Sequence, residues 1–490
     1  MEKRLRLLAL AFCGILECIA APQCERFVAE GINPAFSPDG RLLAFQRLEN
    51  SVFHLGIVPV DGGEVKWIEK GPGMAAYPVW TPSGGILYTY GHDTETARQA
   101  WVAKSQAGYN LRLWENGVKR DITHGRCRDF TPCVSPDGKI AYFASTRWVV
   151  EESKNYSLAT STDIGKVDLA GGEPERIMRS PDGNNTGFIQ PAISPDGQTL
   201  VWGHLENFFG NWRIYGANTG NLARTEWCMV SPPGISALAP RWHPNGRLIC
   251  FTGFRKGDPG WGVWVEDVMT GKVRRIVTGE NPVFSADGKW LAYDRERKVY
   301  VRPFGQADEP DEETLKMARD DLDDEKVLWS IENVVKEQSV TVEDASKFAF
   351  GTDKTFFVRI KARLDGTSGV RQLLIGDYKE HELGFQTIVD RTVWFSTRHM
   401  NGLFAGANSR AYKGGGEYAI TGIRTSRQLL VSVNGCVPAA IPVDMLPLDN
   451  LRRLVVGRGL KKGETVVMAE VGTGWPSGVP KIKTREDLFK

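Results

Sequence analysis

An eight-residue pattern that recurs six times constrains this chain more than any other feature of its sequence. The first copy, N-P-A-F-S-P-D-G, occupies residues 33–40, and the others begin at Tyr77, Thr131, Gln190, Ala239 and Asn281. In S-P-D-G, Pro fixes φ for a tight turn, Asp is tolerated within it, and Gly takes the position that needs a positive φ. An apolar residue precedes each turn and an apolar run follows it. Each copy is therefore predicted to form two short antiparallel strands joined by a hairpin.

The spacing of the copies predicts a ring of similar sheets. The Asp position falls at residues 39, 83, 137, 196, 245 and 287, which gives steps of 44, 54, 59, 49 and 42 residues. Repeats of this length, with four strands each, are typical of β-propeller blades. The last copy supplies only a third strand, at 298–304, before the composition changes. Because residues 24–31 lead into the first copy as 273–280 lead into the last, the N-terminal strand is predicted to complete the last blade and close the ring.

These units resemble the WD40-like (PD40) repeats of TolB-type six-bladed propellers. The resemblance covers residues 24–305 and implies the fold of that segment. It implies no single activity, because propellers serve as scaffolds, as binding proteins and as enzymes.

The rest of the chain is also predicted to be β-structure, so the expected fold class is all-β. Residues 306–338 read as an acidic linker, with ten Asp and Glu residues between 308 and 325. The order F-F-V-R-I-K-A, L-L-I-G-D, L-L-V-S-V-N-G and L-V-V-G-R resembles a LamG or concanavalin-like jelly roll over residues 339–475, leaving 476–490 as a tail. Such β-sandwiches bind carbohydrate or act as spacers, with Asp377 and Asn401 as candidate metal or sugar contacts. No G-x-S-x-G occurs there, which disfavours a peptidase-like arrangement.

The first twenty residues predict export. A basic start is followed by an apolar segment, 7–19, that is too short to span a bilayer, and then by small residues. We interpret 1–20 as a signal peptide, with a retained interfacial anchor as the alternative, and expect a periplasmic or secreted protein with no membrane span after cleavage. The formal net charge of +2 gives no field that would favour nucleic acid.

Six cysteines remain after the predicted cleavage. Cys127 and Cys133 are close enough in sequence to close a short disulfide loop. Scattered buried thiols are the alternative for all six.

Binding is predicted on the end of the ring opposite the S-P-D-G turns, where the loops vary in length. The third unit carries Trp148 and Tyr156 in a long insertion, and the fourth carries Phe208, Phe209 and Trp212. Trp148 and Tyr156 are predicted to grip a partner, with a solvated loop that packs on its neighbour as the alternative. The fourth-unit aromatics suit stacking on sugars or a peptide, although they serve equally well to cap the ring. Arg241 alone is charged at a position held elsewhere by Ala35, Val79, Cys133, Ala192 and Val283. It is a candidate anion ligand at the channel mouth, or an ion-pair partner.

Three histidines are candidate metal ligands. His92 and His204 follow the second strand of units two and four, and His124 enters the third unit. Their convergence at the channel mouth would hold a divalent metal. Oligogalacturonate lyases are similar propellers that use such a cluster, although the predicted number of blades differs. Separate hydrogen-bonded histidines are the alternative, and no other cofactor is predicted.

Three functions follow from these patterns. Because no tight catalytic constellation occurs in the sequence, the leading hypothesis is an exported, non-catalytic protein that engages a polysaccharide or an envelope protein through the loop face and the jelly roll. The second is a metal-dependent polysaccharide lyase or hydrolase with its site at the channel mouth. The third is an envelope assembly scaffold of the TolB kind. The sequence predicts no oligomeric state.

Overall fold

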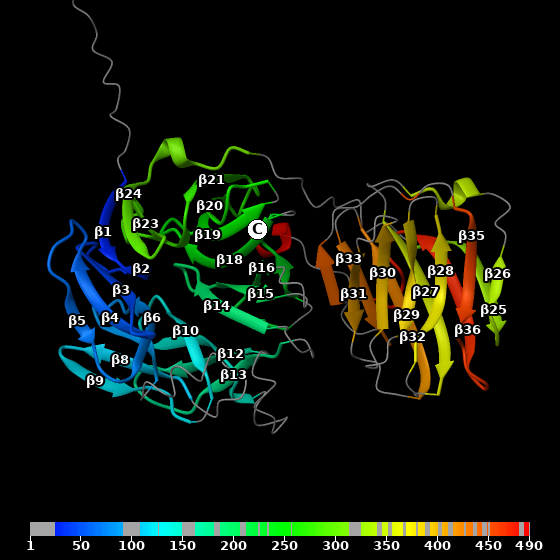
Figure 1. Ribbon diagram of the computed structural model, residues 1–490, viewed down its shortest axis with the longest axis horizontal. Coiled ribbons are helices and arrows are strands. Elements are labelled where there is room, and N and C mark those ends of the chain that lie inside the picture. The colour runs from blue at the N-terminus through cyan, green and yellow to red at the C-terminus, as the bar shows by residue number, and fades with distance from the viewer. Residues whose placement is uncertain are drawn as a thin grey trace, which may run out of the picture.

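Six four-stranded antiparallel sheets and a two-sheet sandwich make up this protein, as a computed structural model shows (Figure 1). The structure describes residues 25–91, 108–125, 127–148, 162–180, 187–205, 212–223, 226–232, 235–255, 257–312, 325–340, 345–350, 355–365, 369–378, 381–387, 393–399, 404–409, 415–425, 428–434, 439–442, 448, 451–479 and 485–489. The predicted signal peptide lies outside this part. No helix in the described part is long and apolar enough to cross a membrane.

Each propeller blade contains four consecutive strands, except that the last blade takes its outer strand from the N-terminus. Blades 1–3 comprise β2 (Ile32–Phe36), β3 (Leu42–Glu49), β4 (Val52–Pro59), β5 (Lys66–Glu69); β6 (Met74–Trp80), β7 (Ile86–Gly91), β8 (Asn110–Glu115), β9 (Val118–Asp121); β10 (Asp129–Val134), β11 (Ile140–Ser145), β12 (Asp163–Asp168) and β13 (Glu175–Met178). Blades 4–6 comprise β14 (Gly187–Ile193), β15 (Thr199–Leu205), β16 (Trp212–Asn218), β17 (Cys228–Met229); β18 (Ile235–Trp242), β19 (Leu248–Arg255), β20 (Gly262–Asp267), β21 (Val273–Thr278); β22 (Glu280–Phe284), β23 (Trp290–Arg295), β24 (Lys298–Pro303) and β1 (Arg26–Glu30).

The N-terminal strand closes the ring, as the sequence predicted. β1 pairs antiparallel with β24, from Arg26 opposite Val301 to Glu30 opposite Lys298. Val28 and Ala29 are buried in one apolar cluster with residues of blades 6 and 1. The pairing joins the first residues of the described chain to the last blade and covers the edge of β24.

The S-P-D-G turns are held by side chains of the pattern itself. The Ser37 hydroxyl donates to the Asp39 carboxylate at 2.6 Å and accepts the backbone N–H of Leu42 at 2.9 Å. The same Ser and Asp contacts recur in the turns of blades 3, 4 and 6. The bond from Ser37 is the main cause that lowers the pKa of Asp39, which identifies the Asp as an ionised turn anchor.

Every innermost strand contains a bulge, and at four of the six blade interfaces the bulge forms a hydrogen bond to the preceding blade. The residue before the first Pro of the pattern has φ between 49° and 54° in all six copies, and the register shifts there. In four of the six interfaces the backbone N–H of this positive-φ residue donates a hydrogen bond to a side-chain oxygen of the preceding blade. The donor and acceptor pairs are Tyr77 to Gln46 at 2.6 Å, Gln190 to Thr131 at 3.0 Å, Asn281 to Thr252 at 2.8 Å, and Asn33 to Asp294 at 2.8 Å.

The second domain is a β-sandwich with one shared core. One sheet runs β25 (Lys326–Val334), β36 (Thr465–Thr473), β27 (Phe356–Leu364), β32 (Gly416–Arg424), β33 (Gln428–Val433), β34 (Ala439–Pro442). The other runs β26 (Gln338–Val340), β35 (Arg453–Arg458), β28 (Arg371–Asp377), β29 (His381–Thr387), β30 (Val393–His399), β31 (Phe404–Ser409). Buried residues of both sheets, including Ile360 and Val456, form a single cluster. The LamG or concanavalin identity of this sandwich stays a prediction.

The predicted linker boundary is wrong at its C-terminal end. Residues 306–338 include β25, which pairs along β36 from Lys326 to Val334 and belongs to the sandwich. Most of this edge strand is exposed or half-buried, and it follows directly on the acidic run that predicted the linker. Short helical segments complete the structure: η3 (Gln306–Asp308), η5 (Ala345–Phe348) and α3 (Arg485–Leu488).

Candidate functional site at the propeller axis

The six innermost strands surround the propeller axis and carry the candidate site. β2, β6, β10, β14, β18 and β22 each contact the next strand around the ring, and β22 contacts β2. Several of their side chains near the bulges keep partial exposure although the strands are central. These half-buried residues are Asn33, Tyr77, Val79, Arg241, Asn281 and Val283. Partial exposure on the innermost strands indicates that these side chains border the axial space.

Arg241 is the unusual residue of this ring. It stands opposite Cys250 in β18 and β19, and its guanidinium donates to the Pro240 carbonyl oxygen at 2.8 Å. Within the described residues no carboxylate forms an ion pair with Arg241. Burial lowers its pKa, and the nearby thiols of Cys133 and Cys250 only partly oppose this. Because a half-buried cation without a counter-charge among the described residues is costly, the position favours binding of an anion.

The thiols beside Arg241 are neutral. Burial raises the pKa of Cys133 to about 12, with the Arg241 charge acting in the opposite direction, and burial likewise raises the pKa of Cys250. Neither thiol therefore supplies the missing negative charge. Cys127 and Cys133 are both free thiols and buried, so the short disulfide loop between them is absent.

A buried carboxyl lies toward the other end of the axis. Asp294, near the end of β23, accepts the backbone N–H of Asn33 at 2.8 Å and the Asn281 side-chain amide at 2.9 Å. Burial raises its pKa to about 7, although both hydrogen bonds lower it, and the exposed Glu280 opposite it adds a smaller upward effect. At equivalent positions the neutral Gln46 and Thr252 make the same inter-blade bond. The hydrogen bond between blades therefore needs no charged acceptor at this position.

Asp294 is a group that exchanges its proton near neutral pH. A carboxyl with such a pKa is suited to general acid or base chemistry when a substrate reaches it. Sequence reasoning missed it because Asp294 belongs to no motif. The recurrent bulge before each Pro, whose N–H needs an acceptor in the preceding blade, was the signal that would have found it.

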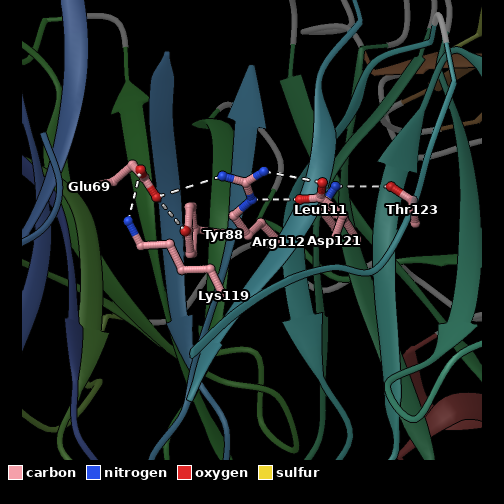
Figure 2. Close-up of polar contacts among 7 residues, drawn as sticks. All are labelled: Glu69, Tyr88, Leu111, Arg112, Lys119, Asp121 and Thr123. Atoms are coloured by element: carbon pink, nitrogen blue, oxygen red, sulfur yellow. Dashed lines mark hydrogen bonds and ion pairs between the residues drawn. The ribbon is translucent and has the colours of Figure 1, made fainter. Parts of the chain in front are cut away.

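The ion pairs between blades 1 and 2 show how the propeller neutralises its other buried charges (Figure 2). Glu69 accepts hydrogen bonds from the Tyr88 hydroxyl at 2.8 Å and from Lys119 at 3.0 Å, with Arg112 4.0 Å away. Arg112 also holds Asp121 through two hydrogen bonds and lies over the Tyr90 ring. Each charge in this cluster has an opposite charge beside it. We therefore assign the cluster to blade packing, in contrast to Arg241.

The predicted aromatic contacts are spread over different environments. The half-buried ring of Trp148 lies over Gly165, in the space that a Cβ at that position would occupy. Trp212 begins β16 opposite Leu205 and is also half-buried. Tyr156, Phe208 and Phe209 lie outside the described residues, so their grouping on the loop face stays a prediction.

Arg241 does not lie at the loop face. It is the penultimate residue of β18, beside the hairpin turn that joins β18 to β19. The prediction of a mouth on the loop side is therefore corrected to a site nearer the opposite end of the axis.

The three predicted metal ligands have unlike surroundings. His204 is buried, with the rings of Phe188, Tyr215 and Trp227 around it. His124 is exposed, and His92 lies outside the described residues. In the described part of the chain, no group of three His, Cys, Asp or Glu side chains is placed to hold a metal ion. In the sandwich, Asp377 pairs with Arg453 at 3.1 Å, and Asn401 lies outside the described residues.

No protein-family model and no curated protein matches the chain. TolB from Acinetobacter baumannii is 20% identical over 58% of this chain and 64% of that protein, with a TM-score of 0.39. Oligogalacturonate lyase from Vibrio parahaemolyticus is 12% identical over 58% of this chain and 92% of that protein, with a TM-score of 0.37. Trypanosoma rangeli sialidase is 13% identical over 92% of this chain and 93% of that protein, with a TM-score of 0.32. At these identities and TM-scores, none of the three assigns an activity to this β-propeller protein.

Proposed function

We propose that this protein is an exported, non-catalytic binding protein that holds a carboxylate of an acidic polysaccharide at the propeller axis. Arg241 is the cationic contact, and residues at the S-P-D-G end of the axis, where Arg241 lies, supply further contacts to the chain of sugars in place of the loop face. The observation that carries the proposal is a half-buried guanidinium on an innermost strand with no carboxylate partner among the described residues. An Arg side chain is well suited to such a ligand, because its planar fork matches a carboxylate with two parallel hydrogen bonds.

The test compares acidic and neutral sugars by isothermal titration calorimetry. Uronic-acid oligomers and a sialylated oligosaccharide are the acidic probes, and a neutral glucan oligomer is the control. We expect at least one acidic probe to bind, and Arg241→Gln to weaken its affinity by about tenfold or more, as for loss of a hydrogen bond to a charged group.

The matched control is Arg41→Gln, because Arg41 is exposed beside the first S-P-D-G turn. It should leave the affinity unchanged. Equal binding by the wild-type protein and the Arg241 variant, or binding of neutral and acidic sugars alike, contradicts the proposal. Capture of an envelope protein by cross-linking without any glycan affinity would instead favour the scaffold hypothesis.

Asp294 favours a polysaccharide lyase or hydrolase as the second candidate. Its pKa of about 7 suits a proton donor or acceptor, and the exposed Glu280 stands opposite it. Product formation from an acidic polysaccharide that is abolished by Asp294→Asn, while binding persists, would establish this alternative. No product from any acidic probe leaves the binding function as the better account.

A further inference from the structure

The last residues of the described chain pack against blades 4 and 5. α3 lies against β16 and β17, and Figure 1 shows this short helix beside the propeller, far along the chain from those strands. Leu488 and Phe489 join the apolar cluster between the two blades. Phe489 meets the Trp242 ring edge-on with the ring centres 6.1 Å apart. The tail therefore covers apolar surface that the propeller alone would leave exposed.

A buried ion pair fixes this tail. Glu266, in β20, has no exposed surface, and its carboxylate pairs with Arg485 of α3. The same guanidinium donates to the backbone carbonyl of Val230, which follows β17. Burial raises the pKa of Glu266 to about 8, and the Arg485 charge opposes that rise. No other basic residue of the described chain forms an ion pair with Glu266, so the propeller buries an acid whose counter-charge comes from the tail.

The surface between blades 4 and 5, here called the seam, also leaves room for the tail. A Cβ on Gly216 of β16 would come within 2.9 Å of the Leu488 side chain and within 3.0 Å of Val230. The absence of a side chain at this position lets Leu488 approach the strand closely. Arg485 thus meets a carboxylate and a backbone carbonyl of the propeller, and Leu488 and Phe489 meet apolar side chains. In the sequence these three residues are spaced as R-x-x-L-F.

The segment that leads from the propeller into the sandwich also contacts blade 5. The backbone of Glu312 forms an isolated bridge with Val273, the first residue of β21, through hydrogen bonds of 3.0 and 3.1 Å. Its side chain pairs with Arg255 at 2.6 Å, and Asp311 pairs with Arg274. The acidic residues next to the propeller therefore contact it directly.

We propose that the seam between blades 4 and 5 is a peptide-docking surface whose occupant is the chain's own segment 485–489. Docking of this segment, together with the contacts of Asp311 and Glu312, fastens the sandwich to blade 5 at both of its ends. The partner chemistry is a peptide with a basic residue followed, three and four positions later, by two large apolar residues. This inference is independent of the axial anion site.

The test supplies the tail as a separate molecule. A fluorescent peptide of residues 481–490 is titrated into the chain that ends at residue 484 and into the full chain, with fluorescence anisotropy as the readout. We expect saturable binding to the shortened chain and at least tenfold weaker binding to the full chain, whose seam is occupied. Peptides with Arg485→Met or Leu488→Asp should not bind, whereas Lys483→Met, outside the docked segment, should bind normally.

A second measurement keeps the proposal testable if the shortened chain does not fold. Hydrogen exchange followed by mass spectrometry is compared for the intact wild-type chain and its Leu488→Asp variant, in which the propeller sequence is unchanged. We expect the amides of 485–489 to exchange at least tenfold faster in the variant. Equal binding of the peptide to both chains, no binding to a folded shortened chain, or equal exchange in the two intact chains overturns the proposal.

Discussion

Replacing Asp294 with Asn tests whether the inter-blade lock of blade 6 contains a carboxyl that titrates near neutrality. The Asn oxygen can still accept the hydrogen bonds from Asn33 and Asn281, which both end on one oxygen of Asp294. The substitution therefore removes the ionisation and keeps the lock. The folded-state pKa is about 7, against the usual 3.8. Between these values the folded state binds more protons than the unfolded state, so stability falls as the pH rises.

The size of this effect follows from the shift. One pKa unit corresponds to about 1.4 kcal/mol, so ionisation of Asp294 costs the folded state about 4 kcal/mol in total, of which about 3 kcal/mol develops between pH 5 and pH 8. We expect Asp294→Asn to gain stability relative to wild type by about that amount over this range. The assay is urea unfolding of the propeller transition, followed by tryptophan fluorescence at several pH values.

Asp39→Asn is the matched control for this experiment. The pKa of Asp39 is lowered from 3.8, so both of its states are ionised above pH 5 and its stability difference from wild type should not change with pH. A difference between Asp294→Asn and wild type that stays flat from pH 5 to pH 8 would refute the reasoning. It would mean that Asp294 is solvated or has a basic partner.

Three further substitutions test the ring and its tail. Arg485→Met leaves Glu266 buried without its counter-charge. Because the pKa of Glu266 is about 8, its carboxyl is mostly protonated at pH 7, so we expect the loss of stability to be small there and to increase by about 1 kcal/mol toward pH 9. A loss independent of pH in urea unfolding would count against this pairing. Val28→Asp puts a charge into the cluster that joins β1 to blades 6 and 1, which should lower stability by at least about 3 kcal/mol, whereas Glu30→Gln on the same strand, at an exposed position, should leave the thermal midpoint unchanged. Gly31→Ala should cost about 1–3 kcal/mol, because φ is 155° and the added Cβ would lie 2.4 Å from the Phe45 ring and 2.8 Å from the Gln46 carbonyl; an unchanged thermal midpoint would contradict the close packing there.

The sequence predicted those parts of the fold that depend on local turn chemistry. Ser37, Asp39 and Gly40 define a hairpin by themselves, and six copies define the number of blades. The parallel between residues 24–31 and 273–280 predicted the pairing of β1 with β24, because both segments lead into the same pattern. The edge strand β25 was misjudged, since its side chains are mostly exposed or half-buried and its partner β36 lies more than a hundred residues away.

The candidate site was only partly predictable. Arg241 was found because it interrupts a series of small or apolar residues, and its place two residues before the turn sets its level near the S-P-D-G end of the axis. The role of Asp294 could not be predicted, because its hydrogen-bond donor, the N–H of Asn33, lies 261 positions away in the sequence. The pairing of Glu266 with Arg485 likewise joins segments that no motif connects.

A crystal structure of the protein bound to the acidic oligosaccharide with the highest affinity tests the central claim most directly. The account predicts a carboxylate of the sugar on the axial side of β18, with both of its oxygens within hydrogen-bond distance of the Arg241 guanidinium. A ligand bound elsewhere, or a protein carboxylate paired with Arg241 in that structure, would contradict it.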